Sequence, residues 1–296
     1  MKRGLIAWDQ AELPPEVFDS RLAAARQRLA SRGLPALAIY SDLWRSNYAR
    51  FYSNFMPYFN RAFLVIPRED RPFLLCGLSP RVYPWIKSVT ILEEIVQSPN
   101  LAQKLIDICA QRGWKQIGFL DPEGMPWDLY SAISPVLELQ DVPHVGDEWQ
   151  RAMHRRAAEM ARAGLAAELP AAAGLTDYEF VGRLERRFRL AGAEDLVILL
   201  ANGGPAPAFA TGQVLRDGFS AIVALEYRGH WAKIAASGLS QGRVAGESRM
   251  ELLSGPLPFE PCRSAKPGDI IARIARADGR YYGDTLWCGE NGLEPL

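Results

Sequence analysis

The residue whose type and position could most clearly support catalysis is a lysine inside a short apolar segment. Lys233 is the only charged residue between Trp231 and Ala235, a stretch that predicts a β-strand. A lysine among apolar side chains can act as a base, as a Schiff-base nucleophile or as an anchor for a carboxylate. It can also extend its ammonium to solvent or pair with an acid such as Glu260. The sequence leaves both interpretations open, and Lys233 is the one catalytic candidate.

The histidines and cysteines predict no second catalytic group. His230 has the right chemistry for a general base, but its strand parity is opposite to that of Lys233, so we expect a structural residue on the other face. His144 and His154 are predicted to lie at the surface. Cys288 could be a nucleophile, yet no histidine is close to it in sequence, and free cysteines usually pack as small core residues.

Four residues are candidates for substrate binding. Asn202 and Gly203 belong to a glycine-containing loop, where a backbone without side chains could approach a ligand closely; a simple turn is the alternative. Trp231 shares the strand parity of Lys233. Arg45 could bind a carboxylate through its planar guanidinium, although exposed arginines without such a role are common.

Composition excludes several classes of protein. The 296 residues include 34 basic and 34 acidic side chains, so no net charge would attract nucleic acid or an anionic membrane. Hydrophobic residues make up 48%, and no apolar run approaches the roughly 18 residues of a membrane span. The start of the chain lacks the apolar core of a signal peptide, and the four cysteines form no C-x-x-C pair. We therefore expect a cytoplasmic protein with small-molecule or protein partners.

The elements that must position these residues fall into two groups. Apolar periodicity and turn residues predict helices and strands that alternate in the first half, which indicates an α/β domain over residues 1–147. The expected helices are 18–33 and about 101–112, and the expected strands are 36–40, 62–66, 72–76 and 116–120.

The second half predicts a different, α+β domain over residues 148–296. An alanine-rich helix over 148–168 is followed by a helix that Thr176 opens as N-cap, with Glu179 completing a capping box. The remaining apolar runs suggest an antiparallel sheet covered by these helices. The expected strands are 198–200, 221–225, 231–235, 270–274 and 281–288.

Several of these stretches resemble the creatinase/prolidase superfamily, the M24 peptidases with the pita-bread fold. The first half resembles its N-terminal domain in Gly33-Leu-Pro-Ala-Leu37 and in Asn47-Tyr48 with Phe51. The second half resembles its helix start in Gly174-Leu-Thr-Asp-Tyr-Glu179. Further similarity lies in Ala191-Gly-Ala-Glu-Asp195, in the hairpin Glu226–His230 and in the closing segment Gly283–Leu286. The resemblance covers nearly the whole chain and implies this two-domain fold.

The resemblance also implies a dinuclear metal centre held by two aspartates, one histidine and two glutamates. Counted from the hairpin, the aspartate positions fall on Ile222 and Lys233. Weaker motifs place Leu252 at the ligand histidine and Phe259 at a second histidine, with Ile274 and Gly283 at the glutamates. None of these side chains is a carboxylate or an imidazole. We therefore expect no metal, no other cofactor and no metallopeptidase activity.

Two further departures from the family concern catalysis and length. Metal-free creatinase relies on a histidine from the loop after the first sheet strand, and Pro207 falls on that position here. Between Ala236 and Leu252, where the family has a long helical segment, this chain has about fifteen residues of predicted loop. The expected pita-bread domain is therefore shortened by an internal deletion over 237–251.

Three functions remain compatible with these observations. The first is a non-catalytic binding or regulatory subunit that forms a homodimer or pairs with a related chain. The second is a metal-independent C–N hydrolase or lyase that uses Lys233 on a small amino-acid-derived or guanidino substrate. The third is a protein-interaction module, for which the neutral composition gives no support. We rank the first slightly above the second.

Overall fold

The structure is a computed structural model, and it describes the chain except residues 1–5, 58–59, 205, 239–248, 255–264 and 278. The chain divides into two compact units, Lys2–His144 and Val145–Leu296. The predicted division lay after residue 147. Each unit has its own sheet and its own hydrophobic core.

The N-terminal unit is built on a six-stranded mixed sheet with the strand order β4-β3-β2-β1-β5-β6. Strand β1 pairs in parallel with β5 and antiparallel with β2. The two other parallel pairs are β3 with β4 and β5 with β6. The strands are β1 (Ala36–Ser41), β2 (Ala62–Pro67), β3 (Phe73–Cys76), β4 (Glu94–Gln97), β5 (Gln116–Leu120) and β6 (Glu138–Asp141).

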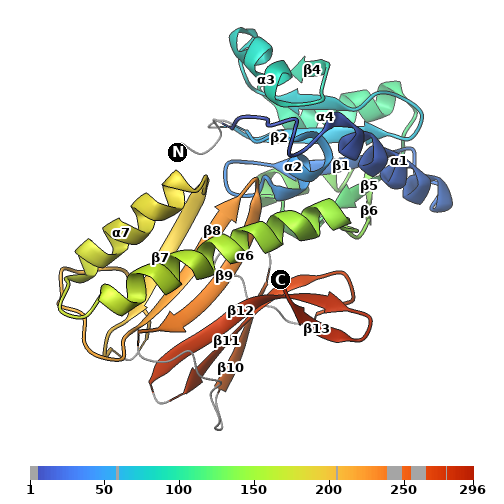
Figure 1. Cartoon of the computed structure of the whole chain (residues 1–296). Helices are drawn as coiled ribbons and strands as arrows, with labels where there is room; N and C mark the ends of the chain where they lie inside the picture. Colours follow the sequence, from blue (N-terminus) through green and yellow to red (C-terminus); the bar gives the residue numbers. More distant parts are fainter. Residues whose placement is uncertain (1–5, 58–59, 205, 239–248, 255–264, 278) are drawn as a thin grey trace. The chain divides into compact units, whose positions relative to one another are not determined.

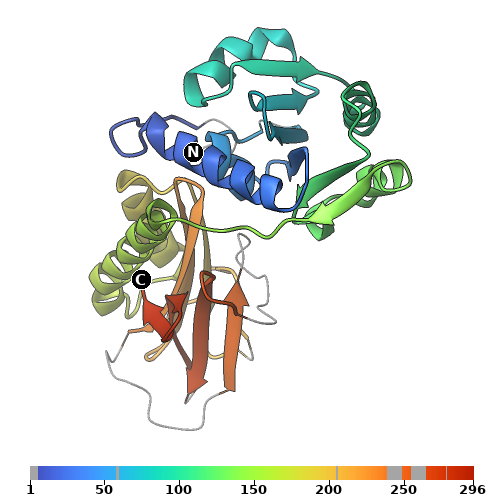
Figure 2. The same cartoon turned by 90° about the vertical axis from the view of Figure 1, so that its right-hand side faces the viewer.

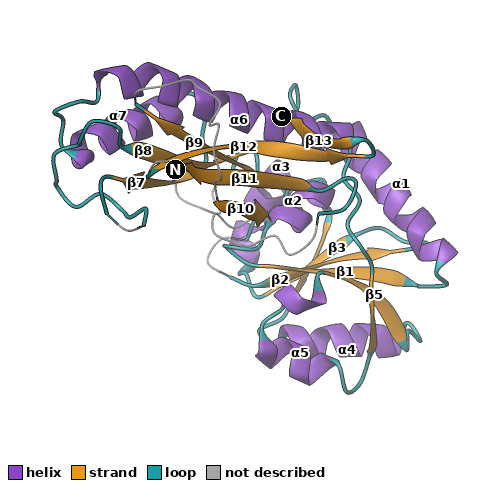
Figure 3. Cartoon of the chain, turned by 90° about the horizontal axis from the view of Figure 1, so that it is seen from below, coloured by secondary structure: helices purple, strands orange, loops and turns teal. Residues whose placement is uncertain are grey.

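Helices cover both faces of this sheet, which is why its central strands are apolar without interruption. Alternate residues of β1 pack on different sides: Leu37 and Ile39 contact the core under α1–α3, while Ala38 and Tyr40 contact the core under α4 and α5. Figure 3 shows α4 and α5 together on one side of these strands. The helices are α1 (Pro15–Ser31), α2 (Asn47–Ser53), α3 (Tyr83–Val89), α4 (Leu101–Gln111) and α5 (Trp127–Ile133), with single 3₁₀ turns η1 (Pro80–Val82) and η2 (Pro122–Gly124).

The C-terminal unit is a strongly curved antiparallel sheet with two long helices. Its strand order is β10-β11-β12-β9-β8-β7, and β13 pairs with β12. Helices α6 and α7 lie on the same side of β7–β9 (Figures 1 and 2). The elements are α6 (Glu148–Glu168), η3 (Leu169–Ala171), α7 (Asp177–Leu190), β7 (Asp195–Ala201), β8 (Ser220–Tyr227), β9 (His230–Ser237), β10 (Arg249–Ser254), β11 (Ile270–Ala277), β12 (Arg280–Gly289) and β13 (Gly292–Pro295).

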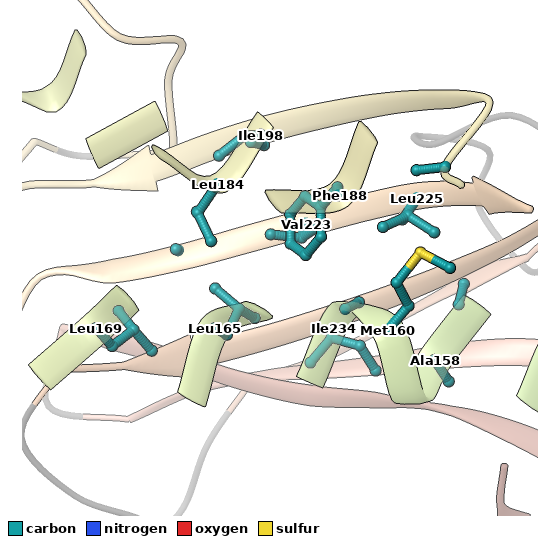
Figure 4. Close-up of a cluster of buried hydrophobic side chains, with 14 of the residues drawn as sticks. Ala158, Met160, Leu165, Leu169, Leu184, Phe188, Ile198, Val223, Leu225 and Ile234 are labelled. Carbon is teal, nitrogen blue, oxygen red and sulfur yellow. The ribbon is translucent and has the colours of Figure 1, made fainter. Parts of the chain in front are cut away.

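One core joins these helices to the sheet. Figure 4 shows Leu165 of α6 and Leu184 and Phe188 of α7 beside Val223 of β8 and Ile234 of β9. On β8 the odd-numbered residues enter this core, and on β9 the even-numbered ones do. The even-numbered residues of β8 and the odd-numbered residues of β9 therefore belong to the opposite face of the sheet.

The fold class predicted from the sequence is confirmed: an α/β unit is followed by an α+β unit with an antiparallel sheet. Helix α6 has its predicted bounds, and Thr176 and Glu179 form the predicted capping box. The predicted loop after Ala236 is shorter than expected, because β10 begins at Arg249. Most of the segment 237–251, which was predicted to be shortened, consists of residues 239–248 and lies outside the described residues. No helix in the described part of the chain is long and apolar enough to span a membrane.

Candidate functional site

Four positions predicted for metal ligands lie on one face of the C-terminal sheet, opposite α6 and α7. Ile222 of β8 pairs with Ala235 of β9, Ala235 pairs with Gly283 of β12, and Gly283 pairs with Ile274 of β11. Directly paired residues place their side chains on the same face of a sheet. Lys233 is two residues from Ala235 on β9 and shares this face. We call the four predicted positions, Ile222, Lys233, Ile274 and Gly283, the ligand row. They come from four adjacent strands.

Lys233 is held firmly at the middle of the sheet. The residue is only 4% exposed. The Thr285 hydroxyl accepts a hydrogen bond from the Lys233 backbone N–H at 2.7 Å and donates one to the Lys233 carbonyl at 3.0 Å. Thr285 thus replaces a backbone partner and fixes the position of Lys233 relative to β12. The lysine side chain therefore extends from a backbone that these two hydrogen bonds hold in place.

Gly283 is closed by its neighbour on β11. A Cβ atom at Gly283 would lie 2.5 Å from the Arg273 carbonyl oxygen and 2.8 Å from the Ile274 Cα atom. Both contacts are with backbone, so a side chain at this position would require the two strands to move apart. The position at which the sequence predicted a glutamate ligand therefore has no space for a glutamate side chain.

The residues of the ligand row do not fit a dinuclear metal centre. Ile222 and Ile274 offer no donor atom, Gly283 has no side chain, and the ammonium of Lys233 would repel a dication. Across the described residues, no group of three or more His, Cys, Asp and Glu side chains could hold a metal ion. The two other predicted ligand positions, Leu252 and Phe259, are apolar residue types. The side chain of Leu252 in β10 is not described, and Phe259 lies outside the described residues.

The sequence reasoning missed an acid on the same face. Glu226 pairs directly with Trp231, and Ala224 pairs with Lys233, so Glu226 and Lys233 are diagonal neighbours on β8 and β9. Glu226 is 3% exposed and Trp231 is also buried. Strand parity could have identified Glu226, since it is separated by two and four residues from Ala224 and Ile222. Glu260, the acid proposed from sequence, lies outside the described residues.

Asn202 and Gly203 contribute to the structure of a loop in this unit. The Asn202 side chain donates to the Val214 carbonyl and accepts from the Arg216 backbone N–H at 2.8 Å. Gly203 has a φ of +83°, and a Cβ there would lie 2.7 Å from a guanidinium nitrogen of Arg216. This arrangement favours the alternative interpretation of the two residues as parts of a turn. Pro207, in the same loop, brings no titratable group.

A buried aspartate at the start of α7 anchors that loop. The two carboxylate oxygens of Asp177 accept hydrogen bonds from the backbone N–H groups of Thr211, at 2.8 Å, and Gly212, at 2.7 Å. Burial acts to raise the pKa of Asp177, but hydrogen bonds from backbone N–H groups outweigh it and hold the pKa below its ordinary value. The charged form of Asp177 therefore stabilises the folded state.

We expect Asp177→Asn to lower the free energy of unfolding by about 1–3 kcal/mol at pH 7, because an amide has one acceptor oxygen for two N–H donors. The folded pKa of Asp177 is depressed, so its stabilisation is present above the unfolded pKa and is lost as pH falls through the folded pKa. The difference between wild type and variant should therefore shrink in acid. Urea unfolding followed by circular dichroism at pH 7 and near pH 3.5 tests this; a difference that grows in acid contradicts it.

The histidines pack against other side chains. His230 packs on the α6 side of the sheet, as its parity indicated, and its Nδ1 lies 2.9 Å from the Arg228 carbonyl oxygen. His154, predicted at the surface, is half-buried: its ring meets that of His230 edge-on at 5.0 Å, and its Nδ1 lies 2.8 Å from the Trp231 carbonyl oxygen. His144, also predicted at the surface, is half-buried as well, and its ring packs against Phe51 in an aromatic cluster.

The two remaining candidates are not part of the ligand row. Arg45 belongs to the N-terminal unit, where its guanidinium is 3.8 Å from the Asp121 carboxylate. Cys288, on β12, is a buried free thiol in a small apolar cluster with Ile271 and Leu286. That packing matches the prediction of a core cysteine.

Comparison with solved structures shows which fold this is. An X-Pro aminopeptidase from Thermotoga maritima MSB8 superposes with a TM-score of 0.69 at 16% identity, over 93% of this chain and 96% of that one. The chain has the prolidase fold. A prolidase from Pyrococcus furiosus gives a TM-score of 0.65 at 13% identity over 93% and 98%. The dipeptidase PepE from Mycobacterium ulcerans gives 0.65 at 14% over 98% and 96%.

The similarity lies in the prolidase fold and not in closely matching sequence. No protein-family model matches the chain, and no curated protein does. The resemblance to the creatinase/prolidase superfamily seen in short motifs is confirmed at the level of fold, with the α/β and pita-bread units in the predicted order. The peptidase activities are those of these three proteins, whose identities of 13–16% show shared architecture alone.

Proposed function

We propose that this chain is a non-catalytic protein with the prolidase fold that acts as a binding or regulatory subunit, as a homodimer or with a related chain. The ligand row carries the proposal. Strand register brings Ile222, Gly283 and Ile274 together on one face beside Lys233, and none of them can replace a carboxylate ligand. Steric exclusion at Gly283 is a second reason to expect no metal ligand there, because backbone atoms of β11 occupy the space that a side chain would need.

Metal content and peptidase activity test the absence of catalysis. The purified chain is incubated with Mn²⁺ or Co²⁺, desalted and subjected to elemental analysis, and then assayed on X-Pro dipeptides beside the Pyrococcus furiosus prolidase. We expect less than one metal ion per chain and no metal-dependent hydrolysis, because the ligand row offers no anionic oxygen. Two bound ions per chain, or hydrolysis that a chelator abolishes, would overturn the proposal.

Oligomeric state tests the subunit role. We propose a dimer at micromolar concentration, and size-exclusion chromatography with light scattering measures it directly. A mass of about twice the 32.9 kDa chain supports a homodimer. A monomer contradicts the homodimer and restricts the proposal to pairing with a different chain, which co-expression with a related chain would then have to show.

One observation favours a second function, a metal-independent hydrolase or lyase. Lys233 and Glu226 are both buried on the ligand-row face. Their diagonal placement puts a basic and an acidic side chain on neighbouring strands. Such a pair could bind a small amino-acid-derived or guanidino compound. Release of ammonia or urea from creatine by the wild type, and its loss in Lys233→Met, would favour this function over the first.

A further inference from the structure

The N-terminal sheet has a switch point that the proposed function does not use. Strands β1 and β5 are parallel neighbours, so their carboxyl ends meet at one edge. From β1 the chain passes through α2 to β2, on one side of the pair; from β5 it passes through α5 to β6, on the other. Helices α2 and α5 pack on opposite faces of the sheet. In open α/β sheets this is the place where ligands bind.

The turn after β1 is fixed and presents an arginine. One carboxylate oxygen of Asp42 accepts hydrogen bonds from the backbone N–H groups of Trp44, at 2.7 Å, and Arg45, at 2.8 Å. The other accepts a hydrogen bond from the Tyr40 hydroxyl at 2.9 Å. These bonds hold the backbone of Arg45 at the edge of the sheet while its guanidinium extends beyond it.

The turn after β5 presents an acid to that arginine. Asp121 has a φ of +53°, a left-handed backbone that costs energy in a residue other than glycine and that recurs at functional sites. Its carboxylate lies 3.8 Å from the Arg45 guanidinium, close enough to attract but too far for a hydrogen bond. The two side chains are 37% and 43% exposed. Both groups therefore remain accessible to another partner.

Two further features belong to the end of β1 and to the segment that follows β5. Gly124 makes room for it, since a Cβ there would lie 2.4 Å from the Asp121 carboxylate and 2.8 Å from the Arg45 guanidinium. The buried Ser41 hydroxyl, on the last residue of β1, has no hydrogen-bond partner among the described residues.

We propose that the carboxyl ends of β1 and β5 bind a free α-amino acid, with its carboxylate on Arg45 and its ammonium on Asp121. An adjacent guanidinium and carboxylate match the two charges of a zwitterion, each of which gains a charge-assisted hydrogen bond. A peptide could satisfy only one of the two groups at either of its ends.

Thermal unfolding of the full chain with each of the twenty L-amino acids, on the order of 10 mM, tests the site. We expect at least one to raise Tm by about 2 °C or more, as mass action requires when ligand is well above Kd. The corresponding amino-acid amide, which lacks the carboxylate, should not. No shift with any of the twenty, or an equal shift with the amide, overturns the proposal.

Three variants locate the binding. Arg45→Gln and Asp121→Asn should each weaken binding, measured by calorimetry, at least about tenfold, the loss of one charge-assisted bond. Gly124→Ala should do so while keeping both charged groups, because its methyl displaces two flexible side-chain ends and no backbone. Arg61→Gln is the matched control: Arg61 precedes β2 at the same edge but is bonded to Asp128 at 2.6 Å. Binding that survives the first three variants, or is lost in the control, refutes the assignment.

Discussion

Gly283→Ala is expected to lower the free energy of unfolding by about 2–3 kcal/mol, the cost of forcing extra volume into a packed site. The added Cβ would lie 2.5 Å from the Arg273 carbonyl oxygen and 2.8 Å from the Ile274 Cα atom. Backbone atoms on a paired strand cannot rotate away, so β11 and β12 must separate. Urea unfolding measures the loss, and Gly283→Glu, which puts a glutamate at the position predicted for a metal ligand, should lose at least as much and bind no Mn²⁺.

Another glycine of β12 provides the control. A Cβ at Gly289 would be 3.0 Å from a carboxylate oxygen of Glu294, the end of a flexible side chain, and its next contact is at 3.4 Å. We expect Gly289→Ala to change the free energy of unfolding by no more than about 0.5 kcal/mol. Equal losses in the two variants would mean that β12 does not distinguish these positions, and the steric argument for a closed ligand row would fail.

The central strands could be predicted because they are buried on both faces or alternate cleanly. Strand β1 is buried at every residue, and its apolar run is visible without any structure. The edge strands β4 and β6 were not predicted: each is bounded by exposed acidic or amide side chains, with partly buried residues only at the centre. Pairing with a neighbouring strand makes them strands, and pairing partners far along the chain leave no local pattern.

The part of the candidate site that depends on strand alternation could be predicted from the sequence, and the part that depends on contacts between distant segments could not. Strand parity was enough to place Lys233 on the face of Ile222, because alternation is a local property. The contact between Gly283 and Ile274 depends on the register of β11 against β12, and the anchoring of Thr211 by Asp177 spans 34 residues. The contact of His154 with His230 was not predicted for a related reason: the helix of His154 carries charged neighbours, and its partner belongs to β9. Such long-range contacts cannot be read from composition or periodicity.

Two helix glycines differ in their surroundings and give the second large prediction. Gly164 lies near the C-terminal end of α6, and a Cβ there would be 2.1 Å and 2.7 Å from two ring carbons of Phe188 on α7. Phe188 is fully buried in the core between the helices and the sheet, beside Val223 of β8 (Figure 4). Glycine at this position therefore allows the two helices to approach each other closely, which conflicts with its low helix propensity.

Gly164→Ala is expected to lower the free energy of unfolding by about 2–3 kcal/mol, because the overlap with Phe188 outweighs a gain in helix propensity of about 1 kcal/mol. Gly182→Ala in α7 is the matched control: nothing lies within 4 Å of its Cβ position, so the same substitution should stabilise by up to about 1 kcal/mol. Chemical unfolding of the two variants beside the wild type measures both effects. If Gly164→Ala destabilises and Gly182→Ala stabilises, close packing against Phe188 is the reason that glycine is required at position 164. If both substitutions stabilise, α6 and α7 have room to move apart and the prediction is wrong.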